Sequence, residues 1–160
     1  QVILDVGKKF GEMTGRSYGF FEAYRLEDAE TAVLLIGSSA GTARAAVDQL
    51  RAEGKKVGML KLRVFRPFPD EELAAVLGHL KALAIMDKAE SFSNAGGPLG
   101  AEVRGALYDL DVRPKTINYV YGLGGRDFRV QDCRTVFEAL DEVVRTGETG
   151  ARYRHLGQRE

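Results

Sequence analysis

Tryptophan is absent from this 160-residue chain, and cysteine occurs once, at Cys133. A single cysteine excludes an internal disulfide framework, a four-cysteine zinc site and a self-contained iron–sulfur cluster. No charge sign is in excess either, since 23 Lys and Arg residues balance 23 Asp and Glu residues. The chain therefore has no general attraction to nucleic acid or to an anionic membrane, and any partner must be recognised locally.

Long hydrophobic runs are also missing. No apolar stretch approaches the roughly 18 residues of a membrane span, and the first 20 residues lack the pattern of a secretory signal. We therefore expect a cytoplasmic protein that uses no membrane as a partner. The composition, 44% hydrophobic and 29% charged, is typical of a globular protein, and the length suits one domain with an appendage.

The stretch 31–36, Thr-Ala-Val-Leu-Leu-Ile, is too short for a helix and predicts a strand buried on both faces of a parallel sheet. A turn rich in Gly and Ser follows at 37–41. Residues 42–53 then place Ala43, Ala46, Val47 and Leu50 on one helical face. This strand, turn and helix are the expected opening of an α/β domain.

The same alternation recurs along the chain, with strands expected at 57–64, 82–86 and 115–121 and helices at 69–80, 99–110 and 130–145. Four strands alternating with four helices predict an α/β fold with a three-layer, open and mostly parallel sheet. Lys61 and Arg63 alternate with apolar residues in the second strand. That alternation places the second strand near the sheet edge.

Residues 1–30 are predicted to form a lead-in segment and linker from a preceding domain. A short helix is expected over 2–14, ended by Gly15, and four aromatic residues follow within 18–24. These rings either pin the segment against the domain or form an interface with a preceding domain or another subunit. Because the sequence opens at Gln1 within a helical pattern, we expect a piece of a longer protein. The α/β domain is expected at 31–145 and a flexible tail at 146–160.

Three Gly-rich turns follow three of the predicted strands, where an open α/β sheet tends to bind ligands. They supply the candidate interface residues, which are also candidates for a weak anion site: Gly37, Ser38, Ser39, Gly41, Thr42, Gly96, Gly97, Gly124, Gly125, Arg126 and Asp127. The spacing at 37–41 matches neither a dinucleotide fingerprint nor a P-loop, so a purely structural turn is the alternative. Arg126 and Asp127 either cap the last helix through a local salt bridge or contact a neighbouring domain.

No residue is predicted to be catalytic, to bind a cofactor in this chain or to ligate a metal. His79 lies at a helix end and His155 in the tail, and neither has a credible catalytic partner. Cys133 lies on the apolar face of the last helix, which predicts a buried small hydrophobe. The isolated chain is therefore expected not to be an enzyme.

Several short motifs in a fixed order resemble the C-terminal part of the alpha subunit of pyruvate:ferredoxin oxidoreductase, in the 2-oxoacid:ferredoxin oxidoreductase family. The resemblance spans most of residues 10–140. It rests on Gly15-Arg16-x-Tyr18-Gly19, Gly37-Ser38, Ala40-Gly41-Thr42, 58–69 (Gly-Met-Leu-Lys-Leu-Arg-Val-Phe-Arg-Pro-Phe-Pro), Met86-Asp87-Lys88-Ala89, Gly96-Gly97-Pro98-Leu99, Glu102-Val103 and 121–127 (Tyr-Gly-Leu-Gly-Gly-Arg-Asp).

The resemblance implies a transketolase C-terminal-like domain within a thiamine-diphosphate-dependent enzyme complex. Such complexes decarboxylate a 2-oxoacid such as pyruvate, reduce ferredoxin through iron–sulfur clusters and pass the acyl group to coenzyme A. Thiamine diphosphate and Mg lie in other domains of the family, and this chain lacks the Gly-Asp-Gly…Asn segment and the cluster cysteines. The implied role is a noncatalytic assembly domain, whose partners are other domains or subunits and, through the complex, ferredoxin and coenzyme A. The alternative is a stand-alone α/β module that binds a phosphate-bearing small molecule such as coenzyme A or a nucleotide.

Overall fold

A computed structural model describes residues 1–92 and 94–157. Six strands form one sheet in the order β1-β3-β2-β4-β5-β6, parallel throughout except that β1 runs antiparallel to β3. Their bounds are β1 Phe21–Tyr24, β2 Thr31–Ile36, β3 Val57–Leu62, β4 Ala82–Asp87, β5 Lys115–Val120 and β6 Tyr153–His155. The expected open, mostly parallel α/β sheet is confirmed.

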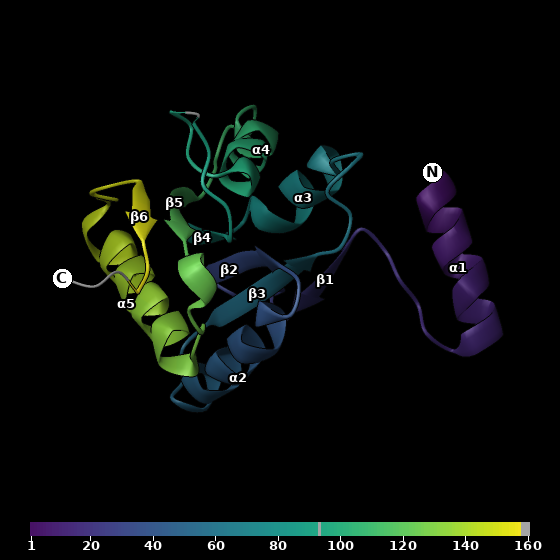
Figure 1. Cartoon of the computed structure of the whole chain (residues 1–160), viewed down its shortest axis with the longest axis horizontal. Helices are drawn as coiled ribbons and strands as arrows, with labels where there is room; N and C mark the ends of the chain where they lie inside the picture. The colour runs from purple at the N-terminus through teal and green to yellow at the C-terminus, as the bar shows by residue number, and fades with distance from the viewer. Residues whose placement is uncertain (93, 158–160) are drawn as a thin grey trace.

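Helices cover both faces of the sheet and complete the three layers (Figure 1). One face packs against α2 (Ser39–Ala52) and α5 (Val130–Thr146), and the other against α3 (Asp70–Leu77) and α4 (Pro98–Leu107). Side chains alternate along β2, so that Val33 and Leu35 join the α2/α5 side while Leu34 joins the α3/α4 side. This explains why β2 carries an unbroken apolar run, because both of its faces are buried.

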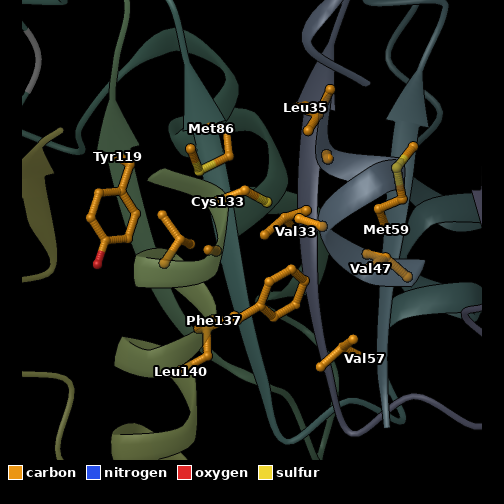
Figure 2. Close-up of a cluster of buried hydrophobic side chains, with 14 of the residues drawn as sticks. Val33, Leu35, Val47, Val57, Met59, Met86, Tyr119, Cys133, Phe137 and Leu140 are labelled. Atoms are coloured by element: carbon orange, nitrogen blue, oxygen red, sulfur yellow. The ribbon is translucent and has the colours of Figure 1, made fainter. Parts of the chain in front are cut away.

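The core on the α2/α5 side is continuous from β3 to β5. Figure 2 shows Phe137 and Cys133 of α5 directed at the sheet beside Val33 and Met86. Cys133 is fully buried, and this burial raises the pKa of its thiol to about 12. The prediction of a buried small hydrophobe at this position is confirmed.

The N-terminal helix α1 (Val2–Thr14) stands apart from the sheet, joined to it by an extended segment (Figure 1). It ends at Gly15, whose φ of 71° is the left-handed conformation that glycine adopts easily. None of its residues is buried. The helix packs mainly on its own linker, where the rings of Phe10 and Tyr18 lie 5.7 Å apart.

The prediction that the second strand lies near the sheet edge is confirmed. This strand is β3, which is separated from the edge only by the short antiparallel strand β1. Lys61 of β3 pairs across the strands with Glu22 of β1, and Arg63 donates a hydrogen bond to the Glu22 carboxylate at 2.6 Å. The polar positions therefore match a charged neighbouring strand, which the sequence pattern had not identified.

The C-terminal segment also differs from the flexible tail expected at 146–160. Within its described part, β6 adds a parallel strand beside β5, with Asn118 opposite Tyr153. Tyr153 and His155 both contact the carboxylate of Glu90, in the segment that follows β4. These two hydrogen bonds hold the pKa of Glu90 below its usual value. The segment is thus held by strand pairing, polar contacts and the single apolar residue Leu156 instead of an apolar stripe, which is why periodicity did not reveal it.

Candidate functional site

The carboxyl ends of the parallel strands surround a cavity of about 450 Å³. The ends of β2 and β4 form two sides of it, and Phe65, the first turn of α4 and Tyr121 complete the wall. Its lining residues are Ile36, Gly37, Ser38, Phe65, Met86, Asp87, Lys88, Ala89, Pro98, Leu99 and Tyr121. The volume falls within the range typical of small-molecule pockets.

A buried polar network lies next to this cavity. Asp87, at the end of β4, accepts hydrogen bonds from the backbone N–H groups of Leu99 and Gly100, each at 2.9 Å. Asn118 of β5 donates its side-chain amide to the Asp87 carboxylate at 2.8 Å and to the carbonyl of Ile85 at 2.9 Å. Asp87 is 5% exposed and Asn118 is fully buried. Asp87 therefore caps α4 from a neighbouring strand, taking the place of a side-chain cap at the helix start.

The glycines of the loop before α4 allow its backbone to approach this network. The Gly97 N–H donates to the Asn118 amide oxygen at 2.7 Å. A Cβ atom at Gly97 would lie 2.4 Å from the Asp87 carboxylate, and one at Gly100 would lie 2.5 Å from the Asn118 amide oxygen. Gly96 has a φ of 104°, and a Cβ there would also clash with Asn118. The Gly96-Gly97 pair is therefore required by internal packing.

The Gly-rich turn after β2 leads directly into α2. Gly37 has a φ of 83°, and the helix begins at Ser39, so Gly41 and Thr42 belong to its first turn. Among the described residues, no side chain caps α2, in contrast with α4, although the N–H groups of Ala40 and Gly41 donate to the carbonyls of Gly37 and Ser38 at 3.4 and 3.0 Å. Because a helix start carries partial positive charge, the uncapped start of α2 favours an anion beside Gly37 and Ser38.

The turn after β5 contains three glycines with positive φ, at 122, 124 and 125, around a short 3-10 turn η1 (Leu123–Gly125). Arg126 and Asp127 are exposed and line a second, smaller cavity of about 230 Å³ that shares Tyr121 with the first. Asp132 accepts a hydrogen bond from the Arg129 N–H at 2.7 Å at the start of α5. The capping expected of the Arg126-Asp127 pair thus comes from Asp132.

The structure brings together Gly37 and Ser38 at the larger cavity, and Arg126 and Asp127 at the smaller one. Sequence reasoning missed the polar pair Asp87 and Asn118, although a polar residue between Ile117 and Tyr119 in a buried strand was a usable signal. It also missed Tyr121, whose ring lies 4.8 Å from that of Phe128. Within the described ranges, no group of three His, Cys, Asp or Glu side chains is arranged to hold a metal ion.

Sheet order and cavity together define a doubly wound α/β domain with a crevice at the carboxyl edge of its strands. Residues 29–133 match the family model described as pyruvate:ferredoxin oxidoreductase core domain II. The chain belongs to this family.

Relatives agree with the family assignment, and a solved structure agrees with the fold. The chain is 42% identical over 160 residues to pyruvate synthase subunit PorA of Thermotoga maritima, covering 100% of this chain and 40% of that protein. It is 46% identical over 149 residues to ketoisovalerate oxidoreductase subunit VorA of Pyrococcus horikoshii, covering 92% and 38%. The chain therefore spans about two fifths of the length of these relatives. The fold is shared with a solved structure of 2-oxoglutarate:ferredoxin oxidoreductase from Magnetococcus marinus with 2-oxoglutarate, coenzyme A and succinyl-CoA bound. The TM-score is 0.58 and the sequence identity is 21%, over 86% of this chain and 21% of that one.

Proposed function

We propose that the chain is a noncatalytic assembly domain of a thiamine-diphosphate-dependent 2-oxoacid:ferredoxin oxidoreductase. The complex would oxidatively decarboxylate a 2-oxoacid to acyl-CoA and reduce ferredoxin in the cytoplasm, with pyruvate as the favoured substrate. The relatives support the reaction class, since their names include pyruvate synthase and ketoisovalerate oxidoreductase. In the described part of the chain, no helix has the length and apolarity needed to cross a bilayer.

The donor groups of this chain do not fit the cofactors of such a complex. Iron–sulfur clusters are held mainly by cysteine thiolates, and Cys133 is buried, with burial raising its pKa to about 12. Asp87, the most buried carboxylate near the large cavity, already accepts three hydrogen bonds. We therefore assign thiamine diphosphate, Mg and the clusters to other parts of the complex. Ferredoxin and coenzyme A are then partners of the complex.

The observation that carries the assembly role is the uncovered apolar face of α1. Val2, Val6, Phe10 and Met13 recur at the spacing of one helical face, on which Tyr18 covers part of Phe10 and the other three side chains are exposed. Val6 is 59% exposed and Met13 is 84% exposed, whereas a helix of this pattern normally buries that face. A neighbouring domain or subunit would cover it, since exposed apolar patches mark interaction sites.

Co-expression with the other subunits of a 2-oxoacid:ferredoxin oxidoreductase from the same organism tests the role. Val6→Ser with Met13→Ser should weaken co-elution in size-exclusion chromatography and lower 2-oxoacid-dependent ferredoxin reduction. Lys8→Ser with Glu12→Ser, on the polar face of the same helix, is the matched control and should assemble as the parent does. Equal assembly by both double variants would refute the role of α1, and assembly by neither would point to helix loss. Circular dichroism of each variant separates those outcomes.

A further inference from the structure

The large cavity lies at the topological switch point of the sheet. The chain leaves β2 for α2 on one face, and it leaves the adjacent strand β4 for α4 on the other face. Where neighbouring parallel strands send their connections to opposite faces, a crevice opens outside their carboxyl ends, and ligands of open α/β sheets bind there. The cavity is lined by the last residues of these two strands, including Ile36 and Met86.

The charges around the cavity favour an anion. Asp87 and Lys88 are the charged side chains among its lining residues. The Asp87 carboxylate is occupied by Leu99, Gly100 and Asn118, so its charge is offset by the start of α4. Lys88 is exposed, with its ammonium 5.5 Å from the centre of the Tyr121 ring. In the part of the chain that the structure describes, the start of α2 carries no side-chain cap, so this helix start and Lys88 are two positive features at the cavity.

A poorly paired hydroxyl group lies next to the same helix start. Tyr121 lines the cavity and is 2% exposed, and its hydroxyl is buried with no hydrogen bond of ordinary geometry in the described part of the chain. The Ser39 hydroxyl, at the first residue of α2, interacts with it and is its polar neighbour within the domain. A buried polar atom left unpaired costs about 1–3 kcal/mol and calls for an explanation such as a missing ligand.

We propose that this cavity binds a small organic anion, a carboxylate or a phosphate monoester, that also carries an apolar group. The anionic end would lie at the start of α2, within reach of Lys88 and the Tyr121 hydroxyl. The apolar group would contact Met86, Leu99 and Phe65, which supply apolar wall. This binding site goes beyond the assembly role and does not depend on it, since α1 takes no part in the cavity.

Nuclear magnetic resonance titration of the 160-residue chain tests the site with four probes: n-butyl phosphate, pentanoate, inorganic phosphate and 1-butanol. We expect n-butyl phosphate or pentanoate to shift the backbone amide signals of 37–40 and Lys88 and to saturate with a Kd of about 1 mM. Whichever of these two anions binds more tightly identifies the head group. Inorganic phosphate and 1-butanol should bind at least about tenfold more weakly, because each lacks one half of the recognised chemistry.

Three variants separate binding from folding. Ser38→Asp should weaken binding by about tenfold or more through repulsion, while a carboxylate at the helix start stabilises the fold. Lys88→Met should weaken binding about fivefold, the order expected of one exposed charge contact. Tyr121→Phe should weaken binding while leaving the fold intact. Lys115→Met makes the same change as Lys88→Met at the amino ends of the strands, where Lys115 begins β5, and this variant should bind as the parent does.

Several results would overturn the proposal. One is that the anions shift backbone amide signals outside the cavity. Another is that neither organic anion saturates its binding. A third is that the Ser38→Asp and Lys88→Met variants bind as tightly as the parent. Tight binding of 1-butanol would also overturn it, because the cavity would then accept a purely apolar group such as a side chain of a neighbouring domain. Failure of the α1 variants to disturb assembly would leave these binding results unchanged, so the two proposals fail separately.

Discussion

Replacing Asp87 with asparagine should destabilise the fold by about 2–4 kcal/mol, although the two side chains have the same shape. Asp87 accepts from Leu99 and Gly100 and from the side chain of Asn118. In Asp87→Asn, one acceptor oxygen becomes an NH₂ group, which faces at least one of these donors in either orientation. The smallest loss leaves the Leu99 N–H unpaired, at about 1–3 kcal/mol. The other bonds lose their charge assistance, which accounts for the remainder.

Asn118 cannot rotate to relieve the mismatch. Its amide oxygen accepts from the Gly97 N–H and its NH₂ group donates to the carbonyl of Ile85, so a flip would break both bonds. The cost of Asp87→Asn must therefore remain in the folded state, at the start of α4. The amides of Leu99 and Gly100 should also exchange with solvent faster in this variant.

Urea unfolding followed by far-ultraviolet circular dichroism measures the effect, since the chain has no tryptophan. The transition midpoint should fall while its slope stays constant, as expected for a change in stability alone. Asp109→Asn makes the same chemical change at an exposed position beyond α4, and it should alter stability by less than about 0.5 kcal/mol. A loss below about 0.5 kcal/mol for Asp87→Asn would refute the capping role assigned to this carboxylate.

Three further outcomes follow from the same structure. Gly100→Ala should destabilise the fold by about 2 kcal/mol in urea unfolding, because the new methyl group meets Asn118. Gly105→Ala, in the same helix but with open space around it, should stabilise the fold by about 0.5–1 kcal/mol. Tyr121→Phe should leave the thermal midpoint unchanged or raise it, because it removes an unpaired buried hydroxyl; a drop of several degrees would show that this hydroxyl is bonded in the fold. The hydrogen bonds that lower the pKa of Glu90 stabilise the fold above the usual pKa of a glutamate side chain. This stabilisation is lost as the pH falls through the lower pKa of the folded state, so the difference in thermal midpoint between parent and Glu90→Gln should shrink in that acidic range.

The sequence predicted the elements that apolar packing defines. β2, β3, β4 and β5 were expected within one or two residues of their bounds, because they carry apolar runs buried by helices on both faces. The strands β1 and β6 were not expected. They are four and three residues long, and polar or aromatic contacts, such as that of Glu90 with Tyr153, hold them in place. Short edge strands of this kind leave no periodic signal.

The candidate site was less predictable because its parts lie far apart in sequence. The Gly-rich turns were visible as motifs, but their meeting with Asp87 and Asn118 depends on the register of β4 and β5, where Ile85 lies opposite Asn118. The environment of Lys61 was unpredictable for the same reason. A lysine that lies opposite Glu22 of another strand and a lysine at an open sheet edge produce the same alternation of polar and apolar residues. The sequence therefore predicted that a site lies at the carboxyl ends of the strands, but it did not identify the side chains that form the site.

The three glycine-rich turns need glycine for different physical reasons, and these reasons indicate different roles for the turns. Gly97 must be glycine because Asp87 occupies the space of its side chain, so its identity is explained within the domain. Gly124 and Gly125 have positive φ, and the space around them is open to 4 Å. Their conformation presents Arg126 and Asp127 at the surface, where internal packing places no demand on them. Contacts with a neighbouring domain should therefore be sought first at 122–127, and the start of α2 is left for a small ligand.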